Sequence, residues 1–250
     1  MPLIYGIHAV TEALRARRVS RLLHERGAGA RVDAIVARAR ELRIPVETVD
    51  RRALERLTRS GVHQGVAADL QPMAAYTVDE LVREADGPAL IVVLDAIEDP
   101  QNVGAILRSA DAAGASGVVR QARHAAPLGG ATARASAGAV SHVRIATVVN
   151  IARALEELKA LDVWTIGLDA GAPGAYDGVD LTQPTALVVG AEGTGLRRLV
   201  RETCDRLVSI PMSGAVSSLN VSVAAGVALF EAARQRRAVR GAPRARGGAR

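Results

Sequence analysis

Three polar side chains precede a long apolar stretch and are placed where they could bind a ligand. Ser217 and Ser218 carry hydroxyls and Asn220 carries an amide, and they follow a strand-like segment that ends in Ile210 and Pro211. Hydroxyl and amide groups at such a position cap the free N–H groups in the first turn of a helix. A helix that only fills a core does not need so many polar groups at its entry, so this cluster indicates a ligand site.

A second polar segment runs from a strand-like stretch into another helix. We expect Asn102 to cap that helix, Gly104 to allow a close approach to its first turn, and Arg108 to project from its polar face. The loop before this helix contains three acids, Asp95, Glu98 and Asp99. Clustered acids could suggest a Mg²⁺ site, but clustered acids in a loop are usually solvated, and we interpret these three as solvated.

A third segment joins an apolar strand to a helix through a glycine-rich turn. The turn contains Gly190, Glu192, Gly193 and Gly195. Backbone N–H groups in such a turn can meet a ligand. The turn is neither a P-loop, because no Gly-Lys-Ser/Thr follows, nor the dinucleotide fingerprint, because its glycine spacing differs. A nucleotide hydrolase is therefore disfavoured.

The elements that must position these segments alternate along the chain, which predicts a mostly parallel α/β sheet. At the carboxyl edge of such a sheet the three polar segments would meet. The last helix has almost no polar face, so we expect it to be buried on more than one side. The expected strands are 90–94, 116–119, 143–147, 163–168, 186–189 and 207–210, with helices at 131–137, 151–161 and 196–203 and a surface loop at 169–178.

The first part of the chain predicts a separate small α/β unit. We place domain boundaries at 1–70, a linker at 71–88, a second domain at 89–235 and a disordered basic tail at 236–250. Between residues 19 and 32 the glycines interrupt any strand. The expected helices of the small unit are 7–14, 32–42 and 53–57, and its strands are 46–49 and 65–70.

Composition narrows the function classes. The net charge is +6, but six arginines and no acid follow residue 235, so residues 1–235 are balanced and the tail is either a solubilising segment or a phosphate tether. Aromatic residues are 2% of the chain, which leaves few rings on which bases could stack. The five histidines lack metal-ligand spacing, and we expect no metal. The single cysteine favours a reducing cytoplasm, and no apolar run is long enough for a membrane span.

The three polar segments, in this order and spacing, closely resemble motifs of the SpoU/TrmH group of knotted RNA 2′-O-methyltransferases. The segment around Asn102 and Arg108 looks like its D-P-x-N-x-G…R motif, the turn at Gly190 like G-x-E-x-x-G, and the segment from Ile210 to Asn220 like I-P-M-x-G-x-x-x-S-L-N. Residues 4–10 and 62–65 look like the ends of the L30e-like RNA-binding domain of the RlmB type. One departure is Ser141, which stands where many relatives have an acid.

The resemblance implies an enzyme with a trefoil-knotted SPOUT methyltransferase domain after a small N-terminal L30e-like α/β domain. It implies S-adenosylmethionine as cofactor, a homodimer, no DNA or membrane partner, and RNA as substrate, a 23S rRNA guanosine ribose in the RlmB type. The family's catalytic positions fall on Asn102, Arg108, Glu192, Ser218 and Asn220. Its cofactor positions fall on Leu168, Gly190, Glu192, Ile210, Met212, Ser217 and Leu219.

Several roles stay open. A guanidinium remains charged in proteins, so we expect Arg108 to grip a phosphate and favour a developing oxyanion, although a general-base role has been proposed for the family's arginine. Glu192 is either a proton acceptor or a loop anchor. The alternatives to an rRNA enzyme are a tRNA ribose methyltransferase of the same superfamily and a non-catalytic rRNA-binding or assembly factor.

Overall fold

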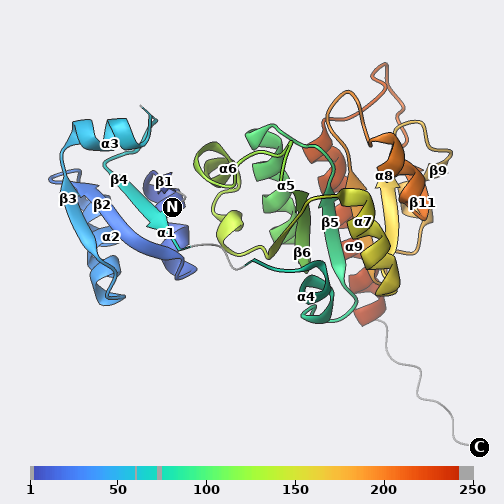
Figure 1. Ribbon diagram of the computed structural model, residues 1–250, viewed down its shortest axis with the longest axis horizontal. Coiled ribbons are helices and arrows are strands. Elements are labelled where there is room, and N and C mark those ends of the chain that lie inside the picture. The colour runs from blue at the N-terminus through green and yellow to red at the C-terminus, as the bar shows by residue number, and fades with distance from the viewer. Residues whose placement is uncertain (1–2, 60, 72–74, 242–250) are drawn as a thin grey trace, which may run out of the picture.

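The computed structural model describes residues 3–59, 61–71 and 75–241, which form two α/β units, each with its own sheet (Figure 1). The smaller unit contains the N-terminal strands and helices. The larger unit contains a seven-stranded parallel sheet and carries the three polar segments.

The small unit is a four-stranded sheet in the order β1-β4-β2-β3. β4 pairs antiparallel with both β1 and β2, and β3 pairs parallel with β2. Helices α1 and α2 pack on one face and α3 on the other. The bounds are β1 Leu3–Tyr5, α1 Ile7–Arg15, β2 Val19–Glu25, α2 Ala30–Glu41, β3 Val46–Val49, α3 Arg51–Leu57 and β4 Val66–Leu70.

Strand β2 corrects the expectation that no strand forms between residues 19 and 32. It is a central strand, although Arg21 and His24 interrupt its apolar pattern. Arg21 pairs across the sheet with Asp69, with 2.8 Å between its Nη2 and the carboxylate. Pairing with residues far along the chain therefore stabilises a strand that local composition disfavours.

The large unit has the strand order β7-β6-β5-β10-β8-β11-β9, with every neighbouring pair parallel. Its strands are β5 Leu90–Leu94, β6 Gly117–Gln121, β7 Ile145–Val148, β8 Trp164–Leu168, β9 Gly174–Ala175, β10 Thr185–Val189 and β11 Arg206–Ser209. Its α-helices are α4 Val78–Arg83, α5 Pro100–Ala113, α6 Gly130–Ala135, α7 Ile151–Ala160, α8 Arg198–Thr203 and α9 Val221–Gly241, with short 3₁₀ turns η1 Ala139–Ser141 and η2 Tyr176–Gly178.

Alternate side chains of this sheet enter two different cores. On β5, Val92 and Leu94 pack towards α5, α6 and α9, whereas Ile91 and Val93 pack towards α4, α7 and α8. A strand covered by helices on both faces is apolar along its whole length, which is why the continuous run at 90–94 was readable in the sequence.

Two predicted segments differ from their expected character. The connection at 71–88 carries α4, whose Val78 and Leu81 are buried in the larger unit. Thr77 and Glu80 form a reciprocal capping box at its start. The tail predicted from residue 236 is helical to Gly241, and its remaining residues lie outside the part of the chain that the structure describes.

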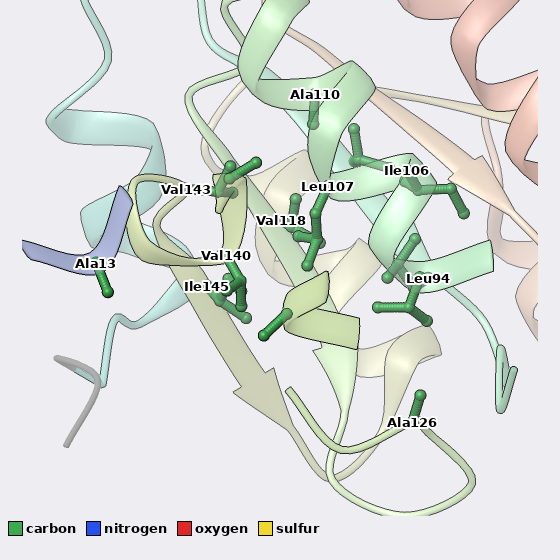
Figure 2. Close-up of a cluster of buried hydrophobic side chains, with 14 of the residues drawn as sticks. Ala13, Leu94, Ile106, Leu107, Ala110, Val118, Ala126, Val140, Val143 and Ile145 are labelled. Carbon is green, nitrogen blue, oxygen red and sulfur yellow. The ribbon is translucent and has the colours of Figure 1, made fainter. Parts of the chain in front are cut away.

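The two units share an apolar cluster. Ala13 of α1 belongs to the same cluster as Leu94, Ile106 and Val118 of the large unit (Figure 2). At the boundary, a Cβ on Gly138 would lie 2.4 Å from the Cβ of Glu12, so only glycine fits there. The small unit therefore packs closely against the region of η1.

Candidate active site

A cavity of about 320 Å³ lies at the carboxyl edge of the large sheet, where the sequence placed the polar segments. The loops after β8, β10 and β11 and the first turn of α9 form its walls. Its lining residues are Leu168, Asp169, Ala170, Val189–Gly193, Gly195, Val208, Ile210, Met212, Ser217–Val221 and Ala224.

All seven residues that the resemblance placed at the cofactor line this cavity: Leu168, Gly190, Glu192, Ile210, Met212, Ser217 and Leu219. Of the five expected catalytic residues, Ser218 and Asn220 also line it, as does Glu192. Apolar side chains, a glycine turn and several polar groups thus share one concave space. Such a mixture is typical of a site for a small organic ligand.

The glycine turn is built on two close constraints. A Cβ on Gly190 would lie 2.1 Å from the carbonyl carbon of Gly195, so a larger residue would force the turn open. Gly195 has a φ of 67°, a conformation that glycine adopts without strain. Hydrogen bonds in both directions between Ala191 and Gly195 close the turn. Backbone atoms therefore form this wall of the cavity.

Three residues from three separate segments form a polar cluster at the cavity. The Nδ2 of Asn102 donates to Glu192 at 3.1 Å, and the Nδ2 of Asn220 donates to Asn102 at 3.0 Å. Asn220 also lies 3.4 Å from both carboxylate oxygens of Glu192. Asn102 is thereby joined to the site although it does not line the cavity.

The helix caps differ from the expectation. Asp99, and not Asn102, caps α5: its carboxylate accepts from the backbone N–H of Asn102 at 2.9 Å, and Pro100 follows at the first helical position. The cap at Asp99 leaves the Asn102 side chain available for the polar cluster. Asn220 caps α9 by accepting from the N–H of Ser222 at 2.9 Å.

Arg108 lies apart from the cavity lining. It is exposed on α5, six residues beyond Asn102, which is about 9 Å along a helix axis. No carboxylate among the described residues forms an ion pair with it. Its charge is therefore open to a partner outside the residues that the structure describes.

Helix α9 is buried on one side within this chain, and the expected burial on a second side stays a prediction that a partner subunit would have to fulfil. One face is buried, with Leu229 at 0% exposure, but Val223 and Phe230 are 50% and 49% exposed. Helices α5 and α9 pack against each other, so this apolar surface lies beside the helix that carries Arg108. The close approach expected at Gly104 is made by α6: a Cβ there would lie 2.3 Å from the Cβ of Ala135.

A second polar cluster, missed by the sequence analysis, holds the glycine turn from the other face of the sheet. Asp95 has no exposed surface and accepts from the backbone N–H of Arg197 at 2.9 Å and from its Nε at 2.7 Å. The Nη2 of Arg197 also donates to Gln121 at 2.8 Å. The expectation that Asp95 is a solvated loop acid is therefore wrong. Its partner lies 102 positions away, and nothing local signalled the pair.

The other two loop acids are also engaged. Asp99 caps α5, and Glu98 lies 3.0 Å from the Nδ1 of His124. Within the described ranges, no group of three or more His, Cys, Asp or Glu side chains could hold a metal ion. Those same ranges also contain no helix with the length and apolar character to cross a bilayer.

A parallel sheet with a ligand-sized cavity at its carboxyl edge places the protein in the class of α/β proteins that bind a ligand at that edge. The SpoU rRNA Methylase family matches residues 89–230, and the family of RNA 2'-O ribose methyltransferase substrate-binding domains matches residues 3–75. The chain belongs to the SpoU rRNA methylase family.

Individual relatives span both units. The 23S rRNA (guanosine-2'-O-)-methyltransferase RlmB of Pseudomonas syringae pv. tomato is 45% identical over 243 residues, covering 95% of this chain and 97% of the relative. The crystal structure of the SpoU methyltransferase AviRb from Streptomyces viridochromogenes with AdoMet superposes with a TM-score of 0.80 at 29% identity, covering 94% and 90% of the two chains. The A. aeolicus TrmH/SpoU tRNA-modifying enzyme has a TM-score of 0.56 at 30% identity and covers 65% of this chain and 82% of its own.

Proposed function

We propose that this protein is an S-adenosylmethionine-dependent RNA 2′-O-methyltransferase that modifies the ribose of a guanosine in 23S rRNA. The observation that carries the proposal is the single cavity lined by all seven expected cofactor residues, with the polar cluster of Asn102, Glu192 and Asn220 beside it. The RlmB relative and the AdoMet-bound AviRb structure support the same reaction and cofactor.

The cavity suits S-adenosylmethionine chemically. Apolar Leu168, Ile210 and Leu219 can contact its adenine ring and the methylene groups of its methionine part, and the Gly190 turn brings backbone groups close without a Cβ in the way. The cofactor supplies an activated methyl group on a sulfonium. In the reaction a C–S bond breaks, an O–C bond to the ribose forms, and the hydroxyl proton leaves.

The chain's own task is to orient the ribose hydroxyl and accept or relay its proton. We assign the orientation to Asn102, Ser218 and Asn220, because hydroxyl and amide groups can hold a ribose without changing charge. Glu192 is within hydrogen-bond distance of Asn102 and is the carboxylate of the cluster. It serves as proton acceptor or as the anchor of the glycine turn.

Arg108 is proposed to grip the phosphate next to the target ribose. Its guanidinium stays charged and can hold a phosphate through two parallel hydrogen bonds. Because it projects about 9 Å along α5 from Asn102, it is placed for a contact beyond the cavity itself. The exposed stripe of Val223 and Phe230 next to α5 supports a homodimer in which Arg108 acts near the partner's site.

The remaining parts of the proposal concern the knot, the N-terminal domain and the cellular compartment. We propose that the loops after β10 and β11 and helix α9 form a trefoil knot around the cofactor cavity, that residues 1–70 form an L30e-like RNA-binding domain, and that the enzyme works in the cytoplasm. The match of residues 89–230 to the SpoU rRNA Methylase family supports the knot, which the family resemblance implies. The match of the substrate-binding family to residues 3–75 supports the RNA-binding domain.

The decisive experiment is to incubate the protein with labelled S-adenosylmethionine and total RNA from a methylation-deficient strain, then to map the 2′-O-methyl site. We expect label in 23S rRNA and none in a DNA copy of the same target, since the 2′-hydroxyl is the substrate. Label in tRNA alone would favour a tRNA enzyme. Failure to bind S-adenosylmethionine in calorimetry would favour a non-catalytic RNA-binding factor.

A further inference from the structure

A second cavity, of about 290 Å³, lies at the boundary between the two units. The small unit contributes Tyr5, His8, Val62 and Gln64 to its walls, and the large unit contributes Arg134 from α6. Figure 1 shows α6 on the side of the large unit that faces the small one, and α6 contacts β1. This cavity shares no lining residue with the cofactor cavity.

The planar, positively charged guanidinium of Arg134 lines this cavity and is supported by an aromatic ring. The guanidinium carbon of Arg134 lies 4.5 Å from the ring centroid of Tyr5. Tyr5 is only 9% exposed, and a Cβ on Gly61 would overlap its ring, so the ring is packed tightly against the backbone at Gly61. The Tyr5 ring therefore supports the Arg134 guanidinium from one side, while Arg134 itself remains exposed.

The charge of Arg134 is not neutralised within the described part of the chain, where no carboxylate forms an ion pair with it. Nearby, Val62 is 78% exposed and offers an apolar wall. The Oε1 of Gln64 accepts from the N–H of Ile7 at 3.0 Å, and its amide nitrogen carries two further donors. His8 is exposed at the same cavity. A planar cation on which a base can stack, an apolar wall and polar groups that can reach its edges are together suited to binding a nucleobase.

We propose that this cavity binds one unpaired nucleotide of the RNA substrate, with its base stacked on the guanidinium plane of Arg134. Specific RNA recognition commonly stacks splayed-out bases on aromatic rings or on arginine planes. With aromatic residues at 2% of this chain, the arginine plane supported by Tyr5 takes the place of a ring. A volume near the ~300 Å³ lower end of ligand cavities fits a single nucleotide.

The proposal rests on RNA being the substrate and adds a second contact point, away from the methylated ribose. Because the walls come from both units, a nucleotide held there would fix the small unit against the large one. The RNA would then be recognised at two positions, one at the reacting ribose and one at the boundary of the units.

The test compares Arg134→Ala, Arg134→Lys and the control Arg153→Ala, which removes an exposed arginine on α7. The probe is an unmodified 23S rRNA transcript, measured by equilibrium binding, by KM and kcat for methylation, and by the salt dependence of binding. We expect Arg134→Ala to weaken RNA binding and raise the RNA KM by roughly 5- to 100-fold, the effect of losing one stacked base. S-adenosylmethionine affinity and kcat should stay at the wild-type value.

The lysine variant separates stacking from charge. If a base stacks on Arg134, Arg134→Lys should lose as much affinity as Arg134→Ala, since lysine keeps the charge but lacks the plane. Wild-type binding by Arg134→Lys, with a shallower salt dependence in Arg134→Ala, would indicate a phosphate contact and overturn the proposal, as would wild-type binding by Arg134→Ala. A wild-type protein that binds the transcript but transfers no methyl group would overturn the proposed function, and the binding comparison would still decide this inference.

Discussion

Two polar clusters hold the same glycine turn from opposite faces of the large sheet, and they are built differently. On the cavity face, Asn102, Glu192 and Asn220 are joined by hydrogen bonds of 3.0 to 3.4 Å, and Glu192 and Asn220 are exposed. On the other face, Asp95 is fully buried and meets Arg197 through bonds of 2.7 and 2.9 Å.

This difference indicates that the Asp95 cluster supports the glycine turn, whereas the Asn102 cluster takes part in the reaction. Short, charge-assisted bonds to a buried carboxylate fix the end of the turn. The longer amide–carboxylate contacts on the cavity face can exchange for contacts to a substrate without unfolding the turn. We therefore expect changes on the cavity face to reduce turnover, and changes on the Asp95 face to reduce stability.

The largest effect on turnover should follow from replacing Arg108, which lies on α5 beyond the polar cluster of the cavity face. Arg108→Ala should lower kcat/KM by about 10²–10³-fold, as for the loss of one group that stabilises developing charge. The free energy of unfolding should not change, because Arg108 is exposed. Steady-state methylation of 23S rRNA gives the first quantity and urea unfolding the second. Near-normal turnover by Arg108→Lys would contradict the two-bonded phosphate grip.

Removing Arg197 should have the largest effect on stability. Arg197→Ala leaves the buried Asp95 carboxylate without its charged partner, which we expect to cost about 3 kcal/mol, the low end for a broken buried pair because the arginine side chain is 46% exposed. The matched control is Arg198→Ala, whose side chain is 82% exposed and pairs with Glu202, itself 54% exposed. Equal denaturation midpoints for the two variants would contradict the supporting role of the Asp95 face.

Asn220 belongs to both functions, and two substitutions can separate them. Asn220→Ala removes the cap of α9 and should cost about 1 kcal/mol of stability. Asn220→Ser keeps a capping oxygen but removes the amide that reaches Asn102 and Glu192. We expect the serine variant to unfold like wild type and to lose turnover. A serine variant with full turnover would show that the amide bridge has no part in the reaction.

The smallest expected effect is on stability at high pH and concerns Cys204, which lies on the same face of the sheet as Asp95. Burial raises the pKa of its thiol from 9.0 to about 12. Because the folded pKa lies above the unfolded one, this contribution to stability is complete below pH 9 and is lost as the pH rises through the folded pKa. Just below pH 9, iodoacetamide should label the native protein far more slowly than the unfolded protein. Equal rates would show that the thiol is accessible and ionises normally.

The two faces of the large sheet differ in how much of their structure could be predicted from the sequence. The buried strands β5 and β10 were readable because β5 is a continuous apolar run and β10 is apolar from Ala186 to Val189. The cavity face was predictable because each of its segments carries a local motif at a strand end. Its residues are far apart along the chain, but the parallel sheet brings those ends together.

The supporting face could not be read in the same way. Asp95 and Arg197 pair over 102 positions, and neither residue differs locally from a solvated loop charge. Strand β2 was missed for a similar reason, since its Arg21 is stabilised by Asp69 on another strand. Two other features did have local signals: Asp99-Pro100 marks the true cap of α5, and Thr77 with Glu80 marks the capping box of α4.

The most direct test of this division is a paired measurement on Glu192→Gln, which keeps the size of the side chain on the cavity face and removes its charge. We expect kcat at saturating RNA and S-adenosylmethionine to fall about 10²-fold, as for a misplaced or missing reacting group, and the urea midpoint to stay at the wild-type value. A variant with wild-type kcat and a lowered midpoint would contradict this division, because Glu192 would then only support the turn.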